Sequence, residues 1–323
     1  MSLSQDGALK TLVRLVLPLP LRMVLWPVRQ RLRQWPSHLQ QWLHDCLPDR
    51  YVQASQFKQR FGRHLNLSPP TTFNEKLHWL MLNYRIPEMT QCADKYEVRK
   101  HVADRGCAIL LNDLYGVWDD PADMVFEQLP DAFVLKVTHG SGQNHICRDK
   151  SRLNVKSTRR QLAEWMRRSE YWVSREWAYK NIRPRIICER LLTDEQGAVP
   201  ADFKFFCFNG EPRFIQVDTD RFTTHLRDIF DLEWKRLPFS FEYAASGRDT
   251  PQPENLESMI SAARALSQGF PFVRVDFYSM GARVIFGEMT WYPEGAMGRF
   301  TPDIYDLQVG EALTLPKPSS HPP

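Results

Sequence analysis

Residues 270–293 read FPFVRVDFYSMGARVIFGEMTWYP, and no other stretch says as much about the architecture. Apolar and aromatic residues fill residues 272–278 and 283–290, with a glycine between the two runs, which predicts a β-hairpin. Asp276 lies near the end of the first strand and Glu288 near the end of the second. Because hard cations prefer oxygen ligands, two carboxylates near the ends of paired strands can hold Mg²⁺.

The spacing of the two acids gives a geometric test of this site. Neighbouring side chains of a strand point to opposite faces. Asp276 and Glu288 can therefore share a face only across an odd-length loop, such as 279–281 with Gly281 left-handed, or with the help of a bulge. A surface hairpin with two solvated acids is the alternative. The apolar residues just before Glu288 weigh against it, since acids are seldom buried without a partner.

Outward from the hairpin, the chain alternates between predicted strands and predicted helices. Strands are expected at 133–137, 145–147, 186–189, 202–208 and 212–217, the last two joined by a turn at Asn209-Gly210. Helices are expected after a capping box formed by Thr72 and Glu75, from about 92 to 105 with a stop at Gly106, within 157–180, and over 254–268. This pattern predicts an α+β fold with antiparallel sheets rather than a doubly wound parallel sheet.

The strand at 133–137 contains a lysine, Lys136, and is followed by the loop HGSGQN at 139–144. Two glycines in such a loop let backbone N–H groups approach a phosphate closely. The loop is neither a P-loop nor a dinucleotide fingerprint, and a tight turn without a ligand would explain it alone. An unpaired ammonium in an apolar strand is costly, however, so Lys136 needs a partner, and a phosphate held beneath the glycine loop would be one.

Two further residues give weaker signals. Lys204 lies in DFKFF at 202–206, where alternating charged and aromatic residues are typical of a half-exposed strand. Glu189 closes the apolar run 186–188, and a strand-end salt bridge to Arg190 or Lys180 explains it equally well on local grounds. Neither residue indicates a site without the others.

Taken in order, these features resemble the ATP-grasp superfamily. The R-V-D and E-M-T of the hairpin look like the R-x-D and E-x-N of D-alanine–D-alanine ligases. More specifically, the hairpin is similar to the TupA-like ATP-grasp family, which is named for teichuronopeptide biosynthesis and is found in polysaccharide loci. Four further stretches are similar to the same family, namely TTFNEKLHWL, DKYEVRKHV, FVLKVTHGSGQN and ADFKFFCFNGEPRFIQVD. The resemblance covers about residues 47–310.

The resemblance implies an ATP-grasp fold, in which two α+β subdomains with antiparallel sheets clasp ATP after a helical N-terminal region. The implied parts are a basic extension at 1–46, a helical region at 47–130, a subdomain with the glycine flap at 131–200, a subdomain with the metal site at 201–312, and a disordered tail at 313–323.

The resemblance also implies roles for individual residues. Lys95 and Lys136 would contact the ATP phosphates. Gly140, Ser141 and Gly142 would form the flap above these phosphates. Glu189 and the backbone of Leu191 would contact the adenine. Lys204 would reach the γ-phosphate and Arg274 would steady an acyl phosphate. The implied Mg²⁺ ligands are Asp276, Glu288 and Thr290. Two positions depart from the pattern: Thr290 stands where the wider superfamily usually has Asn, and Gln143 replaces a commoner small residue.

The implied activity is ATP-dependent ligation of a carboxylate to an amine through an acyl phosphate. The implied substrates are an amino acid or amine and a uronic-acid-bearing surface polysaccharide or its precursor, with the loop at 292–299 as the acceptor pocket. A sugar-nucleotide-dependent glycosyltransferase is the rival, since Asp218-Thr219-Asp220 matches D-x-D, but it leaves Lys136, the flap and the hairpin acids unexplained. The non-enzymatic alternative is a scaffold that keeps the fold but has lost turnover. The presence of Lys136, Asp276 and Glu288 argues against this alternative.

The charge distribution bears on partners. The net charge is +4, and residues 1–50 hold seven Lys/Arg against three Asp/Glu, which leaves 35 of each sign elsewhere. A neutral body argues against nucleic-acid binding. Six cysteines without a CxxC pair indicate reduced thiols, so we expect a cytoplasmic protein.

Residues 9–35 mix aliphatic residues with arginines and are interrupted by prolines, so no run approaches the length that spans a bilayer. Two interpretations stay open for this segment. It is either an extension that packs on the body or a basic amphipathic segment, peripheral at the inner face of the cytoplasmic membrane.

Overall fold

The computed structural model describes residues 47–194, 197–219 and 225–317, and the chain divides into two units, 1–66 and 67–323. In the first unit, helix α5 (Asp49–Phe61) ends at Gly62, whose φ of 74° lets its N–H reach the Lys58 carbonyl at 2.9 Å. The predicted basic extension at 1–46, with its membrane segment 9–35, and residues 318–323 of the predicted tail lie outside the described residues.

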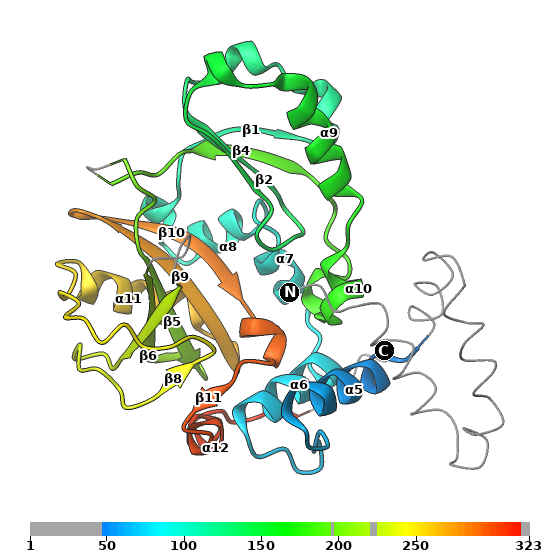
Figure 1. The fold of residues 1–323 in the computed structure, drawn as a ribbon, viewed down its shortest axis with the longest axis vertical. Helices are drawn as coiled ribbons and strands as arrows, with labels where there is room; N and C mark the ends of the chain where they lie inside the picture. Colours follow the sequence, from blue (N-terminus) through cyan, green and yellow to red (C-terminus); the bar gives the residue numbers. More distant parts are fainter. Residues whose placement is uncertain (1–46, 195–196, 220–224, 318–323) are drawn as a thin grey trace. The chain divides into compact units, whose positions relative to one another are not determined.

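The second unit contains two larger antiparallel sheets and one small one (Figure 1). The four-stranded sheet has the order β1 (Leu114–Trp118), β4 (Ile186–Arg190), β2 (Phe133–Val137), β3 (Asn144–Cys147). The five-stranded sheet has the order β10 (Arg283–Thr290), β9 (Phe272–Met280), β5 (Asp202–Phe208), β6 (Glu211–Thr219), β7 (Leu226–Phe230). Strands β8 (Ser240–Phe241) and β11 (Phe300–Thr301) form a small pair. The predicted α+β architecture with antiparallel sheets is therefore confirmed.

Helices connect and cover these sheets. The α-helices are α6 (Phe73–Asn83), α7 (Pro87–Ala93), α8 (Val98–Asp104), α9 (Val155–Met166), α10 (Glu170–Ser174), α11 (Leu256–Ser267) and α12 (Ile304–Glu311). Short 3-10 turns are η1 (Ala108–Leu110), η2 (Pro121–Asp123), η3 (Phe126–Gln128), η4 (Lys150–Arg152), η5 (Trp177–Tyr179) and η6 (Pro293–Ala296). Among the described residues, no helix is both long and apolar enough to cross a bilayer.

Several local predictions are confirmed. Thr72 and Glu75 form the capping box of α6, in which the side chain of each residue accepts a hydrogen bond from the backbone N–H of the other. Asn209 and Gly210 have φ of 52° and 84°, the two positive values that a tight turn between β5 and β6 requires. Gly106 has φ of 75° just after α8.

The single helix expected from about 92 to 105 is wrong. The chain leaves the helix after α7 because the Asp94 carboxylate accepts the backbone N–H groups of Tyr96, at 2.8 Å, and Glu97, at 3.2 Å. A short polar side chain that binds nearby N–H groups competes with helix continuation. Residues 157–180 are likewise divided between α9, α10 and η5, and the region 47–130, expected to be helical, also contains strand β1.

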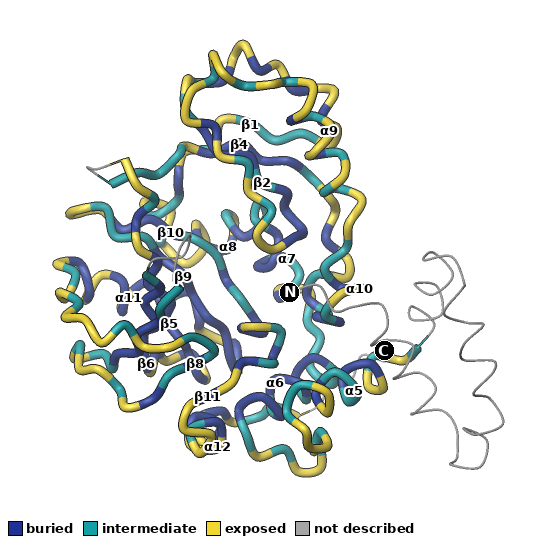
Figure 2. The backbone as a smooth tube through the Cα atoms, viewed as in Figure 1, coloured by how far each residue is buried: buried dark blue, intermediate teal, exposed yellow. Residues whose placement is uncertain are grey.

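Alternation along the strands determines which side chains face the helices. On β2, Phe133, Leu135 and Val137 pack with Leu162 of α9, so Lys136 points to the other face of the sheet. On the five-stranded sheet, α11 packs against β5, β6 and β9. Figure 2 shows these strands as mostly buried. Helices α9 and α11 thus cover one face of the four-stranded and the five-stranded sheet, respectively, and the opposite faces carry Lys136 and Lys204.

Candidate active site

A cavity of about 250 Å³ lies in the second unit and has walls from both large sheets. The predicted site residues in its walls are Lys95, Lys136, Ser141, Gly142, Glu189, Leu191, Lys204, Asp276 and Glu288. Residues distant in sequence therefore meet at one place. Gly140, Arg274 and Thr290 do not line the cavity but are bonded to residues that do.

The β9–β10 hairpin brings its two acids onto one face by means of a bulge. Met280 pairs with Arg283, so the turn has two residues, which excludes the odd-length loop at 279–281 and leaves the bulge as the route to a shared face. The predicted left-handed Gly281 is confirmed, with φ of 59°. An even turn alone would separate the acids, but the register shifts at Gly287 and sets Glu288 opposite Asp276. A Cβ at Gly287 would lie 3.0 Å from the Asp276 carbonyl, so glycine permits this close approach.

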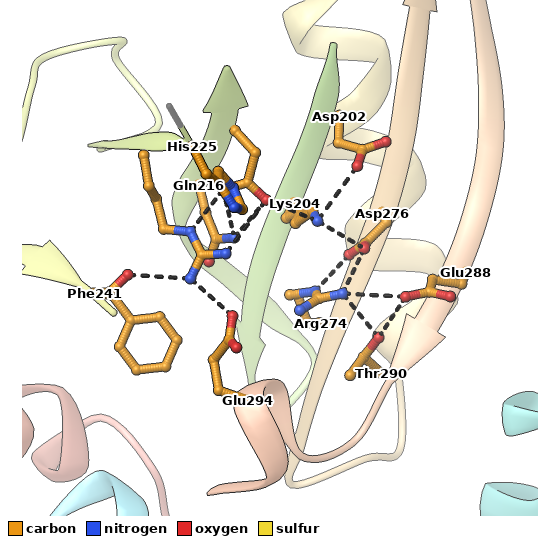
Figure 3. A network of polar contacts seen from close by, with 12 residues as sticks. Asp202, Lys204, Gln216, His225, Phe241, Arg274, Asp276, Glu288, Thr290 and Glu294 are labelled. Atoms are coloured by element: carbon orange, nitrogen blue, oxygen red, sulfur yellow. Dashed lines mark hydrogen bonds and ion pairs between the residues drawn. The ribbon is translucent and has the colours of Figure 1, made fainter. Parts of the chain in front are cut away.

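Arg274 holds the polar end of this hairpin together, as Figure 3 shows. Its Nε donates to Asp276 Oδ1 at 2.7 Å, and its Nη2 donates to Oδ2 at 2.6 Å and to Glu288 Oε1 at 3.2 Å. The Thr290 hydroxyl accepts from Nη2 at 3.0 Å and donates to Glu288 at 3.2 Å. A planar guanidinium suits such forked contacts. The four residues therefore form one connected group.

The two acids differ in their electrostatic surroundings. Burial raises the pKa of Asp276, and the charges of Arg274 and Lys204 oppose the rise without cancelling it. Desolvation by the surrounding protein also opposes ionisation of Glu288, although this side chain is more exposed than that of Asp276, and the charges of Lys95 and Arg274 outweigh it and lower the pKa of this carboxyl to about 2. The Glu288 side chain is 42% exposed. It therefore presents an ionised carboxylate to the cavity at neutral pH.

Lys204 lies at the centre of the five-stranded sheet and is only 5% exposed. The expectation of a half-exposed strand at 202–208 is wrong, because β5 lies between β9 and β6 and all its residues are buried. The ammonium lies 2.9 Å from Asp218, 3.4 Å from Asp202 and 4.0 Å from Asp276. A buried lysine needs such acids to remain charged.

On the opposite sheet, Lys136 has a partner in the protein itself. Its Nζ donates to Glu189 Oε2 at 2.8 Å, and Arg99 approaches the other oxygen at 3.4 Å. The local salt bridge suggested for Glu189 is not formed with Arg190, which pairs with Asp113 instead. Lys136 and Glu189 both line the cavity, so a bound anion would compete with Glu189 for the lysine.

Lys95 lies in the break between α7 and α8 and reaches toward both sheets. Its Nζ donates to the Gly140 carbonyl at 2.7 Å and lies 3.9 Å from Glu288 Oε2. The flap itself contains Gly142 with φ of 71°, and a Cβ at Gly140 would lie 2.2 Å from the Gln143 side-chain oxygen. The unusual Gln143 therefore folds back over Gly140, and the helix break is what directs Lys95 into the site.

A comparison with protein families identifies the family of this chain. Residues 75–314 match the family described as TupA-like ATPgrasp. The chain belongs to the TupA-like ATP-grasp family. The resemblance drawn from the motifs and the ATP-grasp fold that it implied are both confirmed.

Solved structures similar to this ATP-grasp protein include three ligases or synthases. D-alanine–D-alanine ligase from Bacillus anthracis complexed with ATP is 14% identical with a TM-score of 0.42, covering 83% of this chain and 75% of that one. The ATP-grasp ligase PsnB with minimal precursor, Mg and ADP is 13% identical with a TM-score of 0.34, covering 67% and 57%. N5-carboxyaminoimidazole synthase from Aspergillus clavatus is 12% identical with a TM-score of 0.37, covering 63% and 45%. A search of curated proteins gave no match.

Part of the charged network beside Lys204 in this ATP-grasp protein is not marked by any motif in the sequence. Asp218 is 2% exposed, accepts from Arg227 Nε at 2.6 Å and contacts Lys204 at 2.9 Å. Burial opposes ionisation of Asp218, but these two cations hold its pKa well below the usual range. In the sequence, Asp218 stands out only as part of D-x-D, whose Asp220 lies outside the described residues. Arg227 carried no motif, although a charged residue within an apolar strand is itself a signal.

Proposed function

We propose that this ATP-grasp protein is an ATP-dependent carboxylate–amine ligase that works through an acyl phosphate. One observation supports this most directly: the same cavity is lined by three lysines, Lys95, Lys136 and Lys204, and by the carboxylates of Asp276 and Glu288. Phosphoryl transfer depends mainly on positioning and on neutralising phosphate charge. Lysines from separate segments beside a pair of acids are suited to a nucleotide triphosphate with its metal ion.

The donor set fits a Mg²⁺ ion shared with phosphates. Asp276 and Glu288 face each other across the hairpin, with the Thr290 hydroxyl next to Glu288. Mg²⁺ is usually bound through one or two carboxylates plus substrate phosphates and water, so a larger protein cage is not needed. Bound Mg²⁺ would neutralise charge on the transferring phosphoryl group.

The remaining residues are assigned roles by position. Glu189 and Leu191 line the cavity on the flap-bearing sheet, where the adenine would lie, and Gly140, Ser141 and Gly142 would cover the phosphates. Lys204 would contact the γ-phosphate from the opposite sheet. These assignments follow the family resemblance, and they are supported by the fact that all of these residues except Gly140 line the cavity.

The reaction would proceed in two steps. A substrate carboxylate oxygen attacks the γ-phosphorus, the bond to the β-phosphate oxygen breaks, and an acyl phosphate and ADP result. An amine then attacks the acyl carbon, the bond to phosphate breaks, and the amine loses a proton. Arg274 would stabilise the negative charge of this step, and water must be excluded from the acyl phosphate. The loop at 292–299, next to the hairpin acids, is the proposed acceptor pocket, for an amine or amino acid and a uronic-acid-bearing polysaccharide or precursor.

The choice of nucleotide tests this proposal. MgATP at about 100 times its Kd should stabilise the fold by about 2.7 kcal/mol, which a thermal melt detects as a rise in Tm. UDP-sugars should give no rise. Stabilisation by a UDP-sugar with none by MgATP would instead favour the glycosyltransferase. The substrates themselves should emerge from a screen for ADP and phosphate release, with amino acids and uronate-bearing acceptors added in pairs.

A further inference from the structure

A row of charged side chains crosses one face of the five-stranded sheet (Figure 3), with signs that alternate from β7 to β9 and a second acid on β10. From edge to edge the sequence is Arg227 on β7, Asp218 on β6, Lys204 on β5, Asp276 on β9 and Glu288 on β10. The proposed ligase chemistry gives roles to the three residues from Lys204 to Glu288. Arg227 and Asp218 continue the same buried row and have no role in it.

The Arg227 guanidinium is held from several sides and is 3% exposed. Its Nε and Nη2 approach the two Asp218 oxygens at 2.6 and 3.4 Å. Its Nη1 donates to Glu294 Oε1 at 2.9 Å and to the Phe241 carbonyl at 3.1 Å. A charge fixed in this way keeps one position, and it fixes the carboxylate that it binds.

Asp218 is shared between two cations, since its Oδ2 also lies 2.9 Å from Lys204 Nζ. Lys204 has Asp276 on its other side at 4.0 Å, toward the proposed metal site. A buried carboxylate with a single cation binds it strongly, because the low-dielectric interior screens little. With Arg227 taking part of the Asp218 charge, Lys204 is held less tightly and remains available to the cavity.

We propose that Arg227 is a positioning residue, which neutralises Asp218 and thereby leaves Lys204 free to contact the γ-phosphate of ATP. This inference rests on the proposed function, because it takes the nucleotide site as given. Arg227 does not line the cavity, so its effect on the nucleotide passes through Asp218 and Lys204. Its effect should therefore appear in the γ-phosphate contribution to binding and not in the contacts to the rest of the nucleotide.

The variant Arg227→Lys keeps the charge but loses the planar fork that binds both Asp218 oxygens. Asp218 should then draw Lys204 away from the cavity. Calorimetry should measure Kd for MgADP and for Mg²⁺ with the non-hydrolysable analogue AMPPNP, which differ by the γ-phosphate. We expect the ratio of the MgADP to the AMPPNP Kd to fall about tenfold, the size of one charge-assisted hydrogen bond. The Kd for MgADP should change less than about twofold.

Arg236→Lys is the matched control. Arg236 pairs with Asp228, which follows Arg227 on β7 and points to the opposite face of the sheet. The same chemical change there should leave the Kd ratio at the wild-type value. An equal fall in this control would assign the effect to general loosening of β7 and overturn the proposal.

Asp218→Asn provides the second test, which holds even if Arg227→Lys fails to fold. Because it removes the charge that competes for Lys204, the Kd ratio should stay the same or rise, and adding Arg227→Lys to it should change nothing further. A fall in Asp218→Asn, or an unchanged ratio in folded Arg227→Lys, overturns the inference alone. A wild-type protein that binds neither nucleotide overturns the proposed function, and this inference with it.

Discussion

Glu288 is the residue on which the proposed site depends most. Its carboxylate faces the cavity, ionised because Lys95 and Arg274 outweigh the effect of burial on its pKa. The variant Glu288→Gln keeps the shape and removes the charge that would face Mg²⁺. Turnover, measured as ADP release, should fall by about 100-fold or more, since metal-assisted phosphoryl transfer relies on that charge. Because the side chain is half-exposed, the substitution should lower the free energy of unfolding by at most about 1 kcal/mol.

Glu257→Gln is the control for this prediction, because Glu257 is an exposed acid on α11 and such substitutions stay within about 0.5 kcal/mol. It should leave ADP release unchanged. If Glu288→Gln released ADP at the wild-type rate, both the metal assignment and the position of the site would be wrong.

Residues with a local signal could be predicted from sequence, whereas those defined by pairing across strands could not. Lys136 stood out as a charge in an apolar run, and Asp276 and Glu288 stood out as acids on a predicted hairpin. The contact of Asp218 with Arg227 depends on the register of β6 against β7, which no local pattern specifies. The surroundings of Lys204 depend on the strand order, which puts β5 between β6 and β9 and the ammonium between Asp218 and Asp276.

At the scale of elements, the Gly287 bulge is the feature that aligns the hairpin acids. Gly287→Ala places a Cβ 3.0 Å from the Asp276 carbonyl, so one strand must move. We expect a loss of about 1–3 kcal/mol in stability from overpacking. ADP release should fall by more than the loss of folded protein explains, because Asp276 and Glu288 are displaced. Activity per folded molecule, with folding measured by circular dichroism, checks this.

Gly281→Ala tests the other glycine of the same hairpin. Gly281 has φ of 59° with open space around its Cβ position, so alanine should cost about 1 kcal/mol through backbone strain alone. Activity per folded molecule should stay at the wild-type level. Equal losses of activity at both glycines would show that the bulge has no special part in the site. The sequence left both routes open, an odd loop or a bulge, because turn length is settled by pairing at Met280 and Arg283.

At the scale of the whole molecule, the N-terminal extension and the body differ in charge. All site residues lie in the unit 67–323, and the family match begins at residue 75. The body is neutral in sum, yet its charges are unevenly placed. Residues 148–168, from the end of β3 through α9, hold eight Lys/Arg against two Asp/Glu. Composition alone could not show this, since a net charge says nothing about where charges gather.

Deleting residues 1–45 tests whether the extension binds membranes. The deletion removes six Lys/Arg and two Asp/Glu, which is the entire net charge of +4. Each basic residue near an anionic surface contributes about 1 kcal/mol, and the attraction is screened by salt. Full-length protein should therefore sediment with phosphatidylserine vesicles at low salt, and the truncated protein should not. Both should keep the rise in Tm with MgATP. Binding retained after truncation would point to the basic residues at 148–168, and a full-length protein that ignores these vesicles would rule out the membrane proposal.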